Sequence, residues 1–120
     1  KVIKNIEKNT KGQRMRIIKG FYKDTIKNKT TADLKIDKSR VVMIDCDLKE
    51  STHLALEFIN PSIQEGTIIL FDDYNYFKGD INKGEYSAFS EFKEKYPEIL
   101  FRRIFYYGYS GIAFVAYKIS

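Results

Sequence analysis

The sequence has few of the residues that form covalent cross-links or transition-metal sites. It contains one cysteine, Cys46, one histidine, His53, and no tryptophan. A single cysteine excludes an internal disulfide and fits a reducing compartment, so we expect a cytoplasmic protein. With one imidazole and one thiol, a zinc site built from nitrogen and sulfur ligands is not supported either.

Long hydrophobic runs and an N-terminal targeting pattern are also missing. No apolar run approaches the roughly 18 residues that a membrane-spanning helix needs, so we expect no membrane association. The 120 residues are 43% hydrophobic and 15% aromatic, which is typical of a folded chain. This length is enough for one domain with a single core.

Positive charge is concentrated at the front of the chain. Residues 1–40 carry 13 Lys and Arg against 4 Asp and Glu, whereas residues 41–120 carry 8 against 12. A basic front can be a nucleic-acid patch. Lysine dominates over arginine, however, and bidentate contacts to phosphate and guanine favour arginine. We therefore interpret the basic front as a solvated surface and expect no nucleic-acid partner.

Short apolar runs alternate with helical patterns along the chain, which indicates an α/β fold with a mostly parallel sheet. Residues 27–40 are polar and are predicted to be a loop or a weak helix. The last two strands are predicted to form a closing hairpin or to be two adjacent strands. Helices are predicted over 1–10, 50–60 and 85–96, one helical turn over 21–26, and strands over 14–19, 41–44, 67–71, 100–107 and 111–119.

Two of these strands end on doubled carboxylates. One runs into Asp45 and Asp47, and the next runs into Asp72 and Asp73. Asp45 and Asp72 are 27 residues apart, the span of one strand–helix–strand unit, so we expect their strands to be neighbours. Both carboxylate groups would then lie at the sheet edge where ligands of such folds bind.

Carboxylates gathered in this way repel one another unless a cation lies among them. Oxygen ligands suit Mg²⁺, Mn²⁺ or Ca²⁺. An alternative interpretation is that each aspartate caps the helix that follows it. The residues alone leave the metal site and the caps equally open.

The other polar and aromatic residues near these strand ends allow two interpretations each. His53 lies in the first turn of the helix predicted after Asp45. It is either a general base or an ordinary surface histidine. Cys46 lies between two aspartates, which raise a thiol pKa, so we expect no nucleophile. Tyr74, Tyr76 and Phe77 are candidates for a stacking wall or for core packing.

Four segments of the sequence form a familiar set of motifs: IIKGFYKDT (17–25), IDCDLKEST (44–52), GTIILFDDY (66–74) and SAFSEF (87–92). Together they resemble the macrocin O-methyltransferase (TylF-like) family of S-adenosylmethionine-dependent sugar O-methyltransferases. That family commonly shows D-x-D-L-Y-E-S-T after one strand and G-G-x-x-x-x-D-D-Y around the next. Lys49 stands where the family usually has Tyr, and Glu65 where it has the first Gly.

The resemblance implies a Rossmann-like class I methyltransferase fold and Mg²⁺-dependent methyl transfer from S-adenosylmethionine. The acceptor would be a hydroxyl of a sugar, a glycosylated natural product or a similar vicinal-diol small molecule. Asp45, Asp72 and Asp73 match the family's metal-binding carboxylates, and Asp45 is also the best-placed catalytic base, with His53 as the second candidate. Gly20 and Phe21 would lie near the adenine end of the cofactor, and Asp45 and Cys46 nearer its middle.

The Gly-rich strand–turn–helix that holds the methionine end of the cofactor in such folds is absent from this sequence. We therefore expect residues 1–120 to be the C-terminal portion of one methyltransferase domain, inactive by itself, with a sheet that is incomplete on its N-terminal side. An open sheet edge favours a homodimer. The alternatives are another Rossmann-like Mg²⁺-dependent enzyme, such as a hydrolase, and a non-catalytic binding module.

Overall fold

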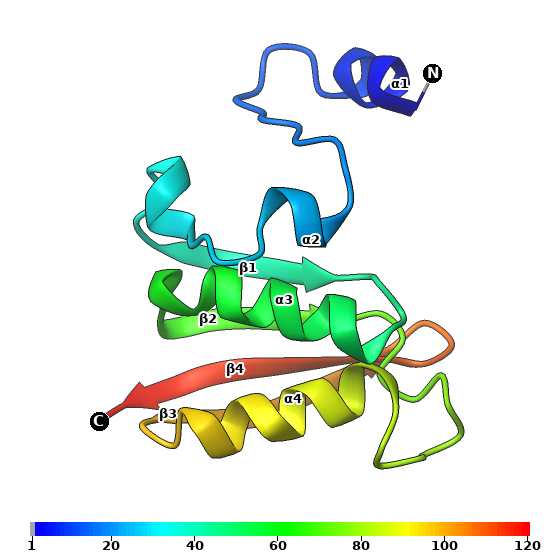
Figure 1. Ribbon diagram of the computed structural model, residues 1–120, viewed down its shortest axis with the longest axis vertical. Coiled ribbons are helices and arrows are strands. Elements are labelled where there is room, and N and C mark those ends of the chain that lie inside the picture. Colours follow the sequence, from blue (N-terminus) through cyan, green and yellow to red (C-terminus); the bar gives the residue numbers. More distant parts are fainter. Residues whose placement is uncertain (1) are drawn as a thin grey trace.

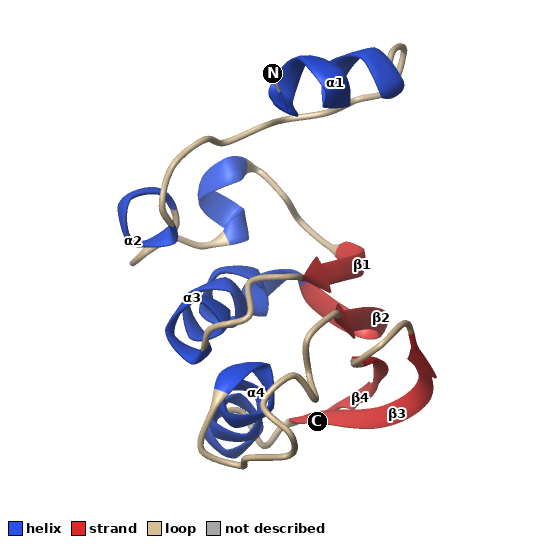
Figure 2. Ribbon diagram, turned by 90° about the vertical axis from the view of Figure 1, so that its right-hand side faces the viewer, coloured by secondary structure: helices blue, strands red, loops and turns tan. Residues whose placement is uncertain are grey.

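The computed structural model describes residues 2–120 and forms two layers, a four-stranded sheet and a pair of helices on one of its faces (Figures 1 and 2). The strand order in the sheet is β1-β2-β4-β3. These elements are β1 (Ser39–Ile44), α3 (Lys49–Ile59), β2 (Ile63–Phe71), α4 (Gly84–Lys95), β3 (Ile99–Tyr107) and β4 (Gly111–Ile119).

The pairing of the strands is mixed. β1 and β2 are parallel, whereas β4 is antiparallel to both of its neighbours, β2 and β3. Three strands therefore run in one direction and the C-terminal strand runs against them. The α/β class and the closing hairpin predicted from the sequence are confirmed.

The core lies between the sheet and the helices. Apolar residues at helical spacing on α3 and α4 meet alternate residues of the strands, which is the arrangement that amphipathic helices and strands require. Leu56, Ile69, Phe71 and Phe89 have no exposed surface. The ring of Phe89 lies 4.7 Å from that of Phe71 and 4.8 Å from that of Phe114, measured between centroids.

The opposite face of the sheet carries no helix of the described residues (Figure 2). Val41 and Met43 of β1 are 59% and 57% exposed there, and Tyr117 of β4 is 53% exposed. β1 is also an edge strand. An apolar face and an open edge are surfaces through which chains associate. The homodimer expected from the sequence stays a prediction.

The predicted strand over 14–19 is wrong. Residues 13–19 have no regular secondary structure and lie apart from the sheet (Figure 1), with Met15, Ile17 and Ile18 exposed. An extended segment becomes a strand only when another strand accepts its hydrogen bonds, and this segment has no such neighbour.

The rest of the N-terminal region agrees more closely with the sequence. α1 (Val2–Asn9) and the single turn of α2 (Tyr22–Thr25) are both present, and Lys1 lies outside the described residues. A short 3₁₀ turn, Thr31–Leu34, interrupts the polar segment over 27–40. No helix among residues 2–120 is long and apolar enough to cross a membrane.

β2 begins four residues earlier than predicted. Gly66 interrupts the strand with a positive φ of 96°, a conformation open to glycine. The next residue, Thr67, accepts a hydrogen bond from the Gln64 backbone N–H at 2.9 Å and donates one to the Ser39 carbonyl at 2.6 Å. These two bonds keep the irregular start of β2 attached to β1.

Leu56→Ala is expected to lower the free energy of unfolding by about 2–5 kcal/mol, because it removes methylene groups from a fully buried site and leaves a cavity. Leu48→Ala is the matched control, since Leu48 is 60% exposed, and its expected effect is about 0.5 kcal/mol or less. Urea denaturation followed by circular dichroism measures both. Equal losses at the two leucines would contradict the observed core.

Candidate metal centre

The parallel pairing of β1 and β2 brings their C-terminal ends side by side. Ile44 lies opposite Phe71, and just beyond this pair the Asp72 backbone N–H donates to the Ile44 carbonyl at 3.0 Å. The loops that begin at Asp45 and Asp72 therefore leave the sheet together. This confirms that the two strands are neighbours, as the spacing of the aspartates predicted.

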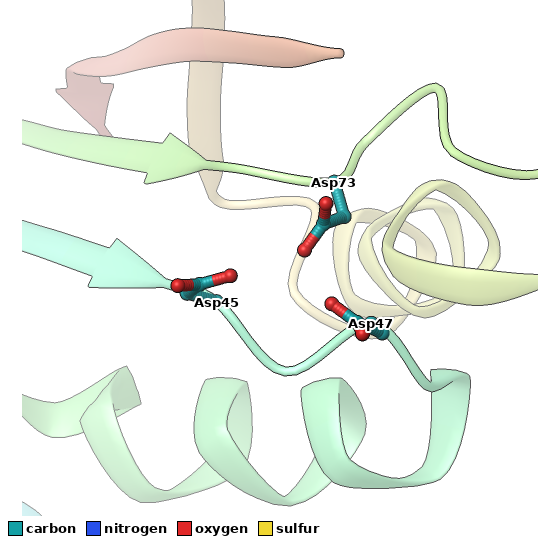
Figure 3. Close-up of side chains that lie close together, drawn as sticks. All are labelled: Asp45, Asp47 and Asp73. Atoms are coloured by element: carbon teal, nitrogen blue, oxygen red, sulfur yellow. The ribbon is translucent and has the colours of Figure 1, made fainter. Parts of the chain in front are cut away.

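Three carboxylates from these loops converge on one space (Figure 3). Asp45, Asp47 and Asp73 each offer an oxygen, and these oxygens all lie within 4.8 Å of one another. Asp47 has a left-handed backbone, with φ of 55°, which aspartate tolerates better than most residues. The turn at this residue leads from the loop after β1 to Leu48, the N-cap of α3.

The close approach of these groups changes their protonation. A hydrogen bond that the protonated Asp73 carboxyl donates to Asp47, then burial and the negative charge of Asp47, raise the pKa of Asp73 from 3.8 to about 7. The Asp73 carboxyl therefore keeps its proton up to about pH 7, because ionising it beside other carboxylates is unfavourable. A divalent cation would relieve the same repulsion.

The aspartates do not cap the helices that follow them. The residue at the N-cap of α3 is Leu48 and that at the N-cap of α4 is Lys83, and neither position has a side-chain capping bond. The capping interpretation is therefore wrong. The doubled carboxylates at the ends of β1 and β2 need a different explanation.

Glu85 is a site residue that the sequence analysis missed. Its side chain is fully buried, and it accepts a hydrogen bond from the Asp73 backbone N–H at 2.9 Å and a longer one from the Cys46 backbone N–H at 3.5 Å. Burial raises its pKa to about 7, against the opposing effect of these two bonds. One feature of the sequence could have identified Glu85: it lies three residues before Ala88, on the apolar face of the predicted helix, where a charged residue is unexpected.

Two residues predicted for the metal or for catalysis lie outside the converging group. The Asp72 carboxylate is not among the three, although its backbone is bonded to β1. His53 is exposed on α3 and lines a cavity of about 640 Å³ together with Lys23, Glu57 and Lys95. Their roles stay predictions.

The residues predicted to contact the cofactor lie before α2 and after β1. Gly20 has a φ of 137°, and a Cβ there would come within 2.9 Å of the Thr25 methyl group. Phe21 is 76% exposed. Burial, and then the charges of Cys46 and Asp45, raise the pKa of Tyr22, so the start of α2 lies near the loop after β1.

Cys46 is half-buried, with its Sγ 3.4 Å from the Thr52 hydroxyl. Burial is the largest cause of a raised pKa for its thiol. The hydrogen bond from Thr52 opposes this shift, and the nearby carboxylates add to it. A thiol with a raised pKa is a poor nucleophile, as the flanking aspartates indicated.

The three aromatic residues after Asp73 have separate roles. Tyr74 packs against Phe71 and Phe114, with both centroid distances 5.6 Å. The ring of Phe77 lies against Gly84, where a Cβ would come within 2.6 Å of it. Of these three rings, that of Tyr76 is the most exposed, at 58%.

The family model for macrocin-O-methyltransferase (TylF) matches residues 2–99. The chain belongs to this family. Among curated proteins, none matches it. The structure is similar to that of the O-methyltransferase NovP, with a TM-score of 0.72 and 24% sequence identity. The match covers 95% of this chain and 43% of the NovP chain, and at this identity it establishes the fold alone.

In the presence of a chelator, the Asp73 carboxyl is expected to make the chain less stable as pH rises from about 4 to about 7. Its pKa is raised from 3.8 to about 7 in the fold, so across this range the folded state keeps a proton that the unfolded state has lost. Asp73→Asn removes this contribution and should reduce the loss of stability between about pH 4 and pH 7. Thermal unfolding in EDTA measures it.

Asp37→Asn, at an exposed position remote from the acidic loops, is the control and should behave like the wild type. If the wild type and Asp73→Asn lose the same stability over this pH range, the proton kept at Asp73 is contradicted.

Proposed function

We propose that this chain carries the metal-binding portion of an S-adenosylmethionine-dependent O-methyltransferase. The acceptor is a hydroxyl of a sugar or of a similar small molecule with vicinal hydroxyl groups. The observation that carries the proposal is the TylF family match over residues 2–99, within which all of the converging carboxylates lie. The chain spans 43% of the similar NovP chain, so the cofactor site is proposed to need residues beyond these 120.

The converging residues suit Mg²⁺ by their chemistry. All three groups offer carboxylate oxygens, the hard ligands that Mg²⁺ prefers, and no imidazole or thiol belongs to the set. Asp45 and Asp73 would hold the ion, with Asp72, as the family motif implies, or Asp47 completing the set. When bound, the ion supplies a positive charge that lowers the pKa of a coordinated hydroxyl.

The chain's own residues then bind and orient the acceptor and accept its proton. Asp45 lies at the end of β1, where it is the first candidate to accept the proton of the reacting hydroxyl. Tyr76 presents an exposed ring next to Phe77, which packs against the start of α4. This ring is proposed to stack on the acceptor. Phe21 is proposed to contact the adenine of the cofactor with its exposed ring.

Asp45→Asn and Asp73→Asn are each expected to lose most of the binding of Mn²⁺, used as a probe for Mg²⁺. Both residues belong to the set inferred from the family motif and to the set that converges in the fold. Losing one charged ligand from so small a set removes much of the attraction for the cation. Isothermal titration calorimetry at one pH measures the affinities.

The single variants Asp47→Asn and Asp72→Asn identify the remaining ligand. The substitution that removes this ligand should weaken Mn²⁺ binding by a factor similar to that of Asp45→Asn or Asp73→Asn, and the other should not. Asp80→Asn is the control, since Asp80 is paired with Lys83 outside the converging group. Wild-type affinity in Asp73→Asn would refute the proposed site.

This chain by itself is expected to bind S-adenosylmethionine more weakly than micromolar. The Gly-rich turn that would hold the methionine end of the cofactor is absent from the sequence. The proposed contacts therefore reach only part of the cofactor; they are made by Gly20, Phe21, Asp45 and Cys46. Calorimetry with the cofactor, with and without Mn²⁺, tests this. Micromolar binding would mean that these 120 residues already form the cofactor site.

A further inference from the structure

The side chain of Glu85 lies where three segments of the fold meet. Glu85 is the second residue of α4, and its side chain is fully buried. Its Oε1 accepts a hydrogen bond from the Asp73 backbone N–H at 2.9 Å, and its Oε2 faces the Cys46 backbone N–H at 3.5 Å. One carboxylate therefore contacts the loop after β1 and the loop after β2 at the same time.

Both contacts are made at the converging aspartates. Cys46 lies between Asp45 and Asp47, and the second donor is the backbone of Asp73 itself. Hydrogen bonds to a charged acceptor are stronger than those between neutral groups, and here they offset part of the cost of burying the Glu85 carboxyl. Asp73 thus donates its own backbone N–H to Glu85, and Asp45 and Asp47 are the two sequence neighbours of the other donor, Cys46.

The start of α4, the helix that carries Glu85, packs closely against the loop after β1. Gly84 has a φ of 65°, and a Cβ at this position would come within 3.3 Å of the Asp47 carbonyl oxygen and 2.6 Å of the Phe77 ring. A larger residue here would have to adopt a left-handed backbone and displace the Phe77 ring, so glycine favours this close approach. The start of α4 therefore packs directly against the turn at Asp47.

Few other bonds join the two loops. The ladder between β1 and β2 ends with the bond from the Asp72 N–H to the Ile44 carbonyl. Beyond that point, no backbone hydrogen bond among the described residues connects residues 45–48 with residues 73–76. Glu85 makes the connection that the backbone does not.

We propose that Glu85 is a positioning residue, which holds the two acidic loops at the spacing at which Asp45 and Asp73, one from each loop, bind the same divalent cation. The inference rests on the proposed metal site and adds a residue that the family motif does not contain. Glu85 is not itself a ligand, because both of its oxygens face backbone N–H groups.

Glu85→Gln tests this role with little change of volume. The variant replaces one acceptor oxygen with an NH₂ group, which cannot accept from the N–H that it would face. The affinity for Mn²⁺ is expected to fall about 10- to 100-fold, as for other residues that orient metal ligands, while cooperative unfolding is kept. Glu94→Gln, at an exposed position on the same helix, is the matched control and should bind Mn²⁺ like the wild type.

A purely structural role gives a different result. In that case Glu85→Gln lowers the melting temperature but leaves the Mn²⁺ affinity of the folded protein unchanged, and the proposal is overturned. If Glu85→Gln does not fold, Glu85→Asp is measured in the same way. If neither folds, hydrogen exchange in the wild type decides: slow exchange of the Asp73 amide supports the bond to Glu85, and exchange at the rate of an open loop overturns it.

The failure of the metal site can be told apart from the failure of this inference. If the wild-type chain does not bind Mn²⁺, the proposed metal site is refuted. Whether Glu85 holds the two loops together is then decided by a separate measurement. Nuclear Overhauser contacts from the Glu85 side chain to the Cys46 and Asp73 amides test the geometry directly. Their presence, with loss of contacts between the loops in Glu85→Gln, supports positioning, and their absence in the wild type overturns it.

Discussion

The register between β1 and β2 is the constraint on which the rest of the site depends. Ile44 pairs with Phe71, and each is followed by an aspartate. A slip of one residue would turn the buried residues of a strand, such as Ile69 and Phe71, toward the bare face of the sheet. The core prevents this, because those side chains are fully enclosed by α3 and α4. Core packing, rather than the aspartates, therefore determines where the carboxylates meet.

The cluster of carboxylates is unfavourable by itself, and the fold maintains it. The raised pKa values of Asp73 and Glu85 show how strongly the folded chain resists further negative charge at this point. Groups that are held in such an arrangement are typical of functional sites, where stability is given up for chemistry. The buried Glu85 and the close contact at Gly84 hold the two loops in this arrangement.

Much of this fold could be predicted from the sequence, because the helices and paired strands carry clear periodic patterns. The strand over 14–19 could not, since its apolar pattern says nothing about whether a neighbouring strand exists to pair with it. The sequence also located the acidic loops but not which oxygens converge. Asp47 joins the group through its left-handed backbone, and Glu85 reaches it from a helix that lies far along the chain. Both depend on tertiary contacts that no local motif encodes.

The most direct test of the central claim is an anomalous difference map from crystals of this chain grown with Mn²⁺. We expect a peak within bonding distance of Asp45 and Asp73, with the Glu85 carboxylate directed at the backbone behind them. A bound ion at another group of carboxylates, with this space empty, would contradict the claim that the β1–β2 pairing builds a metal centre.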